Sequence, residues 1–185
     1  MSYTFSRRNF MKYTALAAAA VAVSGSLTGC SNPNRPVGKT GDTLKPGSGI
    51  CEATLLSGDS KPTYNLTDKK LVCNFKIKSL IAGLQVSKGH FQVDVTGGEH
   101  PGSYNVNTHP TGVAAATFEL TGGNDATTKN QILPNVALTV TGIDLTSATN
   151  VAVRYCPKHS ADENGKDLYN DVYATWNITA NDLGL

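Results

Sequence analysis

The sequence predicts an all-β protein that folds as an antiparallel β-sandwich of seven or eight strands. Apolar and polar residues alternate over short segments, and turns containing glycine or proline separate these segments. Threonine, asparagine and glycine are abundant, whereas only 16% of the residues are charged. No segment of the predicted domain has the periodicity of an amphipathic helix. Two sheets that bury their alternating faces together satisfy this pattern.

The first half of the domain contains four expected strands, at residues 50–56, 71–81, 90–96 and, as a short edge strand, 103–106. Residues 71–81 alternate most clearly, with asparagine and lysine opposite the apolar face, which is typical of a half-buried antiparallel strand. The residues expected to face the core are Cys51, Ala53, Leu55, Leu71, Cys73, Phe75, Ile77, Phe91, Val93 and Val95.

The second half contains four further expected strands, at residues 113–120, 135–143, 150–156 and 169–179, with a polar loop at residues 157–167. Cys156 is in phase with Ala152 and Arg154, so it is expected to point away from the core or to lie at the strand end. The expected core residues are Ala114, Ala116, Phe118, Leu120, Val136, Leu138, Val140, Val151, Val153, Tyr155, Val172, Ala174, Trp176 and Ile178.

Residues 1–29 are predicted to be a signal peptide. A basic start with Arg7, Arg8 and Lys12 precedes an alanine-rich apolar run at residues 14–23. This run is about half of the roughly 20 residues that span a bilayer, so no permanent transmembrane helix is expected. The segment resembles a twin-arginine signal, whose pathway exports folded proteins. The residues that carry this resemblance are Ser6-Arg7-Arg8-Asn9-Phe10-Met11-Lys12.

A resemblance to a bacterial lipobox follows at Leu27-Thr28-Gly29-Cys30. It implies that Cys30 becomes the mature N-terminus and carries the acyl chains of a lipid anchor, such as palmitate, at the extracytoplasmic face of the cell membrane. Residues 30–49 are expected to be the lipidated cysteine and a flexible tether rich in proline and glycine, which spans about 60 Å when stretched. Residues 50–185 are expected to be the sandwich domain.

Cleavage before Cys30 leaves 156 residues with 13 basic and 14 acidic side chains, because three basic residues and no acidic ones leave with the signal. This length fits one domain with a sizeable core. A nearly neutral domain lacks the basic surface of a nucleic-acid-binding protein. The expected partners are the membrane, reached through the anchor, and a surface protein or polymer.

Three cysteines remain if Cys30 is lipidated, which predicts one disulfide and one free thiol, or an intermolecular bond. We favour a bridge between Cys51 and Cys73, since both lie on core faces near the starts of early strands. It would close a loop of about 22 residues and contribute roughly 3 kcal/mol. A bridge from Cys73 to Cys156 is the alternative.

The order of the segments resembles the telokin-like, immunoglobulin-related domain of bacterial surface lipoproteins, a family of unknown function. This resemblance covers residues 36–179 and implies an Ig-like sandwich with a surface role and no catalytic residues. The segments that carry it are Gly41-Asp42-Thr43, Leu71-Val72-Cys73-Asn74-Phe75-Lys76-Ile77, Val86-Ser87-Lys88-Gly89-His90-Phe91-Gln92-Val93 and Val151-Ala152-Val153-Arg154-Tyr155.

A copper protein is the alternative function. Two histidines and a cysteine are the ligands of blue-copper sites, and His90, Cys156 and His159 supply that set. The arrangement is similar to that of cupredoxins of the azurin and plastocyanin type. No methionine follows the signal, so the axial position would be taken by Glu163 or Asn164.

Other chemistry is not indicated. The sequence has no nucleophile elbow, phosphate-binding loop or zinc-protease helix motif, so we expect neither an enzyme nor a cofactor. The favoured function is a membrane-anchored extracytoplasmic lipoprotein whose Ig-like domain has a binding or structural role.

Overall fold

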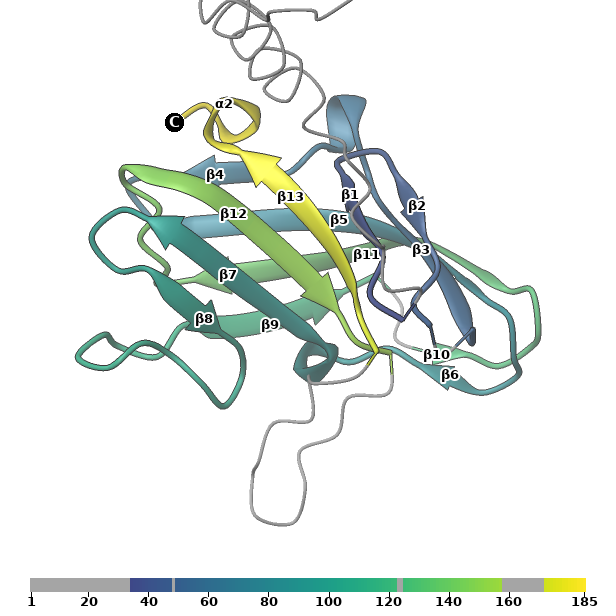
Figure 1. Cartoon of the computed structure of the whole chain (residues 1–185). Helices are drawn as coiled ribbons and strands as arrows, with labels where there is room; N and C mark the ends of the chain where they lie inside the picture. Colours follow the sequence, from purple (N-terminus) through teal and green to yellow (C-terminus); the bar gives the residue numbers. More distant parts are fainter. Residues whose placement is uncertain (1–33, 48, 123–124, 158–171) are drawn as a thin grey trace, which may run out of the picture. The chain divides into compact units, whose positions relative to one another are not determined.

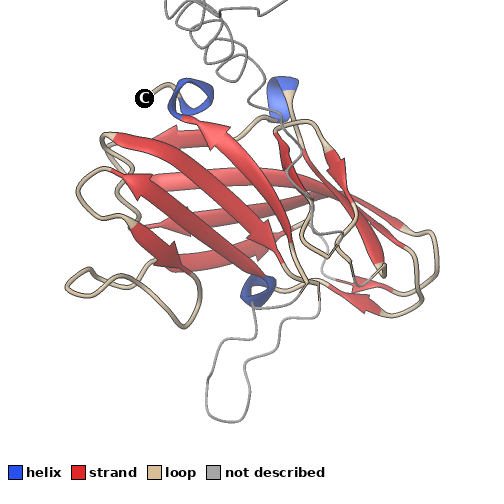
Figure 2. Ribbon diagram, in the orientation of Figure 1, coloured by secondary structure: helices blue, strands red, loops and turns tan. Residues whose placement is uncertain are grey.

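The structure, a computed structural model, describes residues 34–47, 49–122, 125–157 and 172–185. In these ranges the regular structure is almost entirely β, which confirms the predicted sandwich (Figure 2). The strands are β1 (Val37–Lys39), β2 (Thr43–Leu44), β3 (Cys51–Leu55), β4 (Thr63–Asn65), β5 (Lys70–Ser79), β6 (Leu84–Gln85), β7 (Phe91–Gly97), β8 (Gly102–Tyr104), β9 (Thr117–Thr121), β10 (Asp125–Ala126), β11 (Ile132–Thr141), β12 (Ala148–Tyr155) and β13 (Ala174–Thr179).

Two sheets lie face to face (Figure 1). One has the order β1-β13-β12-β7-β8, and the other has the order β2-β3-β5-β11-β9 with β4 also paired to β5. β1 runs parallel to β13, whereas the other neighbours in these sheets are antiparallel. β6 and β10 form a separate two-stranded ladder.

The core between the sheets consists of the residues that the alternation predicts. Of the 24 predicted core residues, Ala114 is exposed, while Ala116, Leu120 and Val172 are partly buried; the others are buried. Aromatic rings connect the two sheets, because Phe75 of β5 lies 5.3 Å from Phe91 and 5.5 Å from Trp176 between ring centroids. Burial of these alternating faces is the main source of stability.

The N-terminal segment differs from the expected tether. β1 and β2 lie inside residues 30–49 and pair with β13 and β3, respectively. The buried Trp176 indole donates a hydrogen bond to Asp42 O at 2.9 Å, which holds the turn between these two strands. Glycine and proline in this segment therefore mark turns between short edge strands, and the sandwich begins at β1.

The other strand predictions need smaller corrections. The strand expected at residues 113–120 begins at Thr117, because Ala114 and Ala115 are exposed. β4, β6 and β10 were not expected from the sequence. The register of β11 shifts between Leu133 and Val136, where Pro134 has no N–H for a regular ladder.

Helical structure in the described ranges is limited to short pieces. α2 (Ala180–Leu183) begins at Thr179, whose side chain accepts a hydrogen bond from Asp182 N–H. Two single turns of 3-10 helix occur, at Gly58–Ser60 and Lys88–His90. None of these described helices is long and apolar enough to cross a membrane.

Candidate functional site

An open groove lies beside β9 and has a volume of about 660 Å³. One side is formed by Phe118 to Thr121 of β9, and the other by Gln85, the last residue of β6, together with residues 86–88. Next to the groove, β6 pairs with β10 over only two residue pairs, Leu84 with Ala126 and Gln85 with Asp125. Its volume lies within the range of about 300–1,000 Å³ that small-ligand sites occupy.

The backbone of β9 presents unused hydrogen-bonding groups at this groove. Gly142 N–H donates to Lys69 O at 2.9 Å, so the even-numbered residues of β11 direct their peptide groups toward β5. The odd-numbered residues therefore bond to Thr117, Glu119 and Thr121 of β9.

By the same alternation, the N–H and C=O groups of Phe118 and Leu120 point away from β11. In the described ranges no further strand pairs with β9, and no loop backbone bonds to either residue. The groove is therefore lined by an unpaired strand edge.

The side chains at the groove combine an apolar floor with an acidic rim. Phe118 and Val86 are buried at 3% and 1% exposure, so only part of their surface is available. Glu119, Asp125 and Lys88 are exposed lining residues, and together they carry one net negative charge. This arrangement favours a ligand with a positive charge near Glu119.

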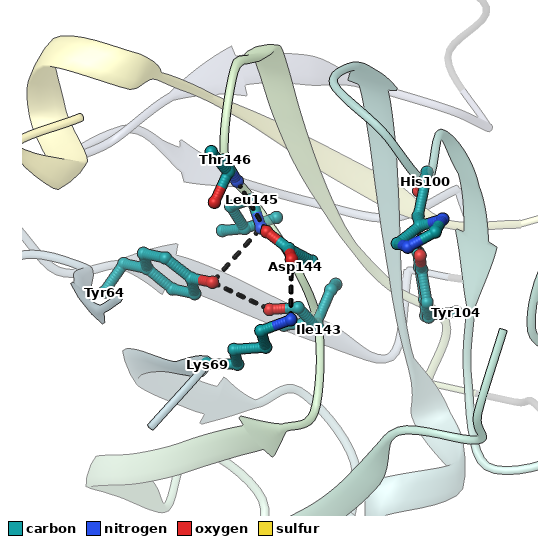
Figure 3. Close-up of polar contacts among 8 residues, drawn as sticks. All are labelled: Tyr64, Lys69, His100, Tyr104, Ile143, Asp144, Leu145 and Thr146. Atoms are coloured by element: carbon teal, nitrogen blue, oxygen red, sulfur yellow. Dashed lines mark hydrogen bonds and ion pairs between the residues drawn. The ribbon is translucent and has the colours of Figure 1, made fainter. Parts of the chain in front are cut away.

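A cluster of polar side chains joins the turn after β11 to β4 and to the start of β5 (Figure 3). Lys69 Nζ lies 2.7 Å from Asp144 Oδ2, and this contact lowers the pKa of Asp144 well below its usual range. The Tyr64 hydroxyl donates to Ile143 O at 2.9 Å and accepts from Leu145 N–H at 3.1 Å. Each of these bonds fixes the backbone turn, which indicates a structural role.

Figure 3 also shows the Tyr104 hydroxyl, which donates to His100 O at 2.8 Å. Burial raises the pKa of Tyr104, and Asp144 adds to this effect. His100 thus contributes its backbone to loop structure.

A second polar cluster lies on the outer face of the sheet that contains β7, β8 and β12. Asp94 accepts hydrogen bonds from Gln92 Nε2 at 2.7 Å and Ser103 Oγ at 2.6 Å. Arg154 Nε lies 2.6 Å from the other oxygen of Asp94, and its guanidinium stacks 4.9 Å above the Tyr173 ring. These contacts connect Asp94 of β7 with β8 and β12, so the cluster holds the three strands together.

The cysteines do not form the predicted bridge. Cys51, Cys73 and Cys156 are all buried thiols, and no disulfide joins any two of them. Cys51 pairs with Ser79, six residues along β5 from Cys73, which corresponds to about 20 Å. A disulfide requires Cα atoms within about 7 Å, so the Cys51–Cys73 assignment is wrong, and the alternative Cys73–Cys156 bridge is also absent.

The surroundings of Cys51 and Cys73 predict that these thiols are unreactive. Burial raises the pKa of both Cys51 and Cys73 to about 12. The Tyr155 hydroxyl, whose own pKa burial raises, lies at the Cys51 thiol. A thiol with such a pKa is neutral and a poor nucleophile at physiological pH.

Two of the residues proposed as copper ligands lie next to each other. Cys156 N–H donates to His90 O at 2.8 Å, as the continuation of the β12–β7 ladder. His90 Nδ1 accepts a hydrogen bond from Ser87 N–H at 3.3 Å, so a metal would have to bind through Nε2. His159, Glu163 and Asn164 lie outside the described residues, and among the described residues no three acidic, histidine or cysteine side chains form a metal-binding group.

Comparison with known proteins identifies the N-terminus. Residues 4–24 match the family of twin-arginine translocation pathway signal sequences. The protein therefore carries a twin-arginine signal, which implies export across the cytoplasmic membrane. Neither the comparison with curated proteins nor that with solved structures gives a match. The matched residues precede the sandwich, so the resemblance to the telokin-like domain remains a prediction.

Sequence reasoning missed the groove and both polar clusters. A strand pattern does not reveal whether its segment lies at the edge or in the middle of a sheet, so nothing distinguishes β9 in the sequence. Lys69 and Asp144 are 75 positions apart, and no local spacing connects them.

Proposed function

We propose that the protein is an exported bacterial lipoprotein, anchored through Cys30, whose Ig-like sandwich serves as a binding module outside the cytoplasmic membrane. The observation that carries this proposal is the position of the lipobox directly after the twin-arginine signal. The signal match ends at residue 24, and Leu27-Thr28-Gly29-Cys30 follows.

The sandwich would lie close to the membrane surface. Residues 31–36 separate Cys30 from β1, and six residues span at most about 20 Å. Two or more acyl chains on Cys30 would make this attachment stable, because each buried CH₂ contributes about 0.8 kcal/mol. The groove beside β9 supports a binding role.

Metabolic labelling tests the anchor. Cells that express the full chain should incorporate labelled palmitate into the protein, and the protein should fractionate with membranes. The Cys30→Ser variant should lose both properties. Replacing Arg7 and Arg8 by lysine together should retain the precursor in the cytoplasm. Unmodified Cys30 in a membrane-free exported protein would contradict the proposal.

A copper site is the second candidate, and the contact between the backbones of His90 and Cys156 favours it. Titration with Cu(II) should then produce an intense thiolate-to-copper absorption band that Cys156→Ser abolishes, while Cys73→Ser should leave it unchanged. Absence of this band would exclude blue copper and leave the proposed binding role as it stands.

A further inference from the structure

We propose that β9 binds an extended peptide, which adds as an antiparallel strand to its open edge and places a lysine or arginine opposite Glu119. This inference rests on the proposed binding role and names the ligand class. It does not depend on the lipid anchor, so the two proposals can fail separately.

The backbone of β9 provides the hydrogen-bonding groups that an added strand needs. Phe118 and Leu120 direct two N–H and two C=O groups toward the groove, and the register of β9 with β11 is continuous over five residue pairs. A peptide residue opposite each of them would complete two antiparallel hydrogen-bonded pairs. Thr117, Glu119 and Thr121 already bond to β11, so the peptide would not compete with the existing ladder.

The side chains of β9 determine which peptide sequence would match this edge. In an added strand, the residue opposite Glu119 points to the same outer face as the Glu119 carboxylate, whereas its neighbours point inward beside Phe118 and Leu120. The matching peptide therefore has the pattern apolar-basic-apolar. Asp125 at the same groove adds to the preference for a basic ligand, because Glu119 and Asp125 together outweigh the single positive charge of Lys88.

The same charge argues against a second copy of this chain as the occupant. If two β9 strands paired antiparallel with both Phe118 and Leu120 in use, Glu119 would face Glu119. Like charges directly opposite each other destabilise a strand pair. A peptide with a cation at this position avoids this repulsion.

The probe for the test is a blocked pentapeptide of threonine, valine, lysine, valine and threonine. It should bind the full-length protein purified after export with a dissociation constant below about 1 mM. Hydrogen exchange followed by NMR should show slower exchange at the amides of Phe118 and Leu120. The Glu119 amide, which already faces β11, should not change.

Matched peptides and protein variants separate strand addition from general attraction. The same peptide N-methylated at both valines lacks the two donors and should not bind. A peptide with glutamate in place of lysine should bind about two- to fivefold more weakly, and Glu119→Lys should reverse this preference. Asp59→Lys makes the same charge change on a distant 3-10 turn and should leave the preference unchanged.

Four results would overturn the inference: no binding at about 1 mM, equal binding of the N-methylated peptide, protection at another edge, or an unliganded dimer in which Phe118 and Leu120 are already protected. A membrane-anchored protein that fails these tests would lose only the peptide site. A protein that passes them without a lipid would lose only the anchor.

Discussion

Gly122 lies where β9 ends beside the register shift in β11. Its φ is +94°, and a Cβ atom at this position would overlap the carbonyl oxygen of Asn135. The close approach of two backbones therefore requires glycine.

We predict that Gly122→Ala destabilises the protein by more than about 3 kcal/mol, because both the backbone conformation and the contact with Asn135 become unfavourable. Urea unfolding measures this change. Gly58→Ala is the matched control, since φ at Gly58 is also positive, +64°, but nothing lies within 4 Å of its Cβ position. Its cost should be about 1 kcal/mol. Equal costs would show that the contact is unimportant.

Asp144 should make stability depend on pH in the acid range. Its hydrogen bond with Lys69 lowers the pKa of the folded carboxyl below the ordinary value of 3.8. The resulting stabilisation is present above that value and disappears as the pH falls through the lower folded pKa. Asp144→Asn should therefore lose stability at pH 7, and its difference from the wild type should shrink below pH 3.8.

Lys69→Met tests the cause of this effect, because it removes the partner and leaves Asp144 in place. The double variant with both Lys69→Met and Asp144→Asn should be at least as stable at pH 7 as the sum of the two single-variant effects predicts. If the wild type and Asp144→Asn differed by the same amount at every pH, the ion pair would not be responsible.

The thiols of Cys51 and Cys73 should differ in reactivity between the folded and the unfolded protein. In the native protein at pH 8, Cys51 and Cys73 should react slowly with an alkylating reagent, because their pKa values of about 12 and their burial keep them neutral and inaccessible. Unfolding without reductant should make them reactive, and mass spectrometry can assign the labelled residues. Labelling that requires a reductant would show a disulfide.

Among the elements, β1 and β2 show how short strands differ from a tether. Each has only two or three residues, yet β1 is an edge strand of one sheet, β2 is an edge strand of the other, and the Trp176–Asp42 hydrogen bond holds the turn between them. A Pro- and Gly-rich composition is compatible with both states, and the partner strands decide between them.

Removing residues 31–44 should therefore destabilise the domain. The loss of two strand pairings and of the acceptor for Trp176 should cost about 2 kcal/mol or more, which lowers the unfolding midpoint by about 5 °C. Deletion of residues 31–33 alone is the control, because it keeps Asn34, whose carbonyl accepts hydrogen bonds from Gly47 N–H and Tyr173 N–H, and this shorter deletion should melt like the full mature protein. Equal melting of both deletion variants would restore the tether prediction.

At the scale of the whole molecule, export and folding are linked. The twin-arginine pathway carries folded proteins, and the cytoplasm keeps cysteines reduced. A sandwich whose described cysteines are thiols can complete its core before export. Its stability then comes from apolar burial between two sheets.

Phe75→Ala should consequently impair export. Phe75 is fully buried and contacts the aromatic rings of the opposite sheet, so its loss should cost about 3–5 kcal/mol, a large part of the stability of a typical domain. Cell fractionation should show precursor in the cytoplasm. Lys76→Ala, on the exposed face of the same strand, should be exported normally. Equal export of both variants would contradict the link.

Local sequence patterns were sufficient to predict the signal, the all-β class and most of the core. These properties depend on local patterns: a basic pair before an apolar run, and side chains that alternate along each strand. The alternation at Leu71, Phe75 and Ile77 specifies a buried face whichever strand lies beside it.

Which strands are neighbours could not be predicted from these local patterns. Strand order and register arise from contacts between segments far apart in the chain, which no local pattern encodes. They place Cys51 opposite Ser79 instead of near Cys73, join Lys69 to Asp144, and leave one edge of β9 without a partner strand among the residues that the structure describes. The candidate binding site therefore became visible only after the sheets were assembled, because an open edge is a property of the sheet rather than of the strand.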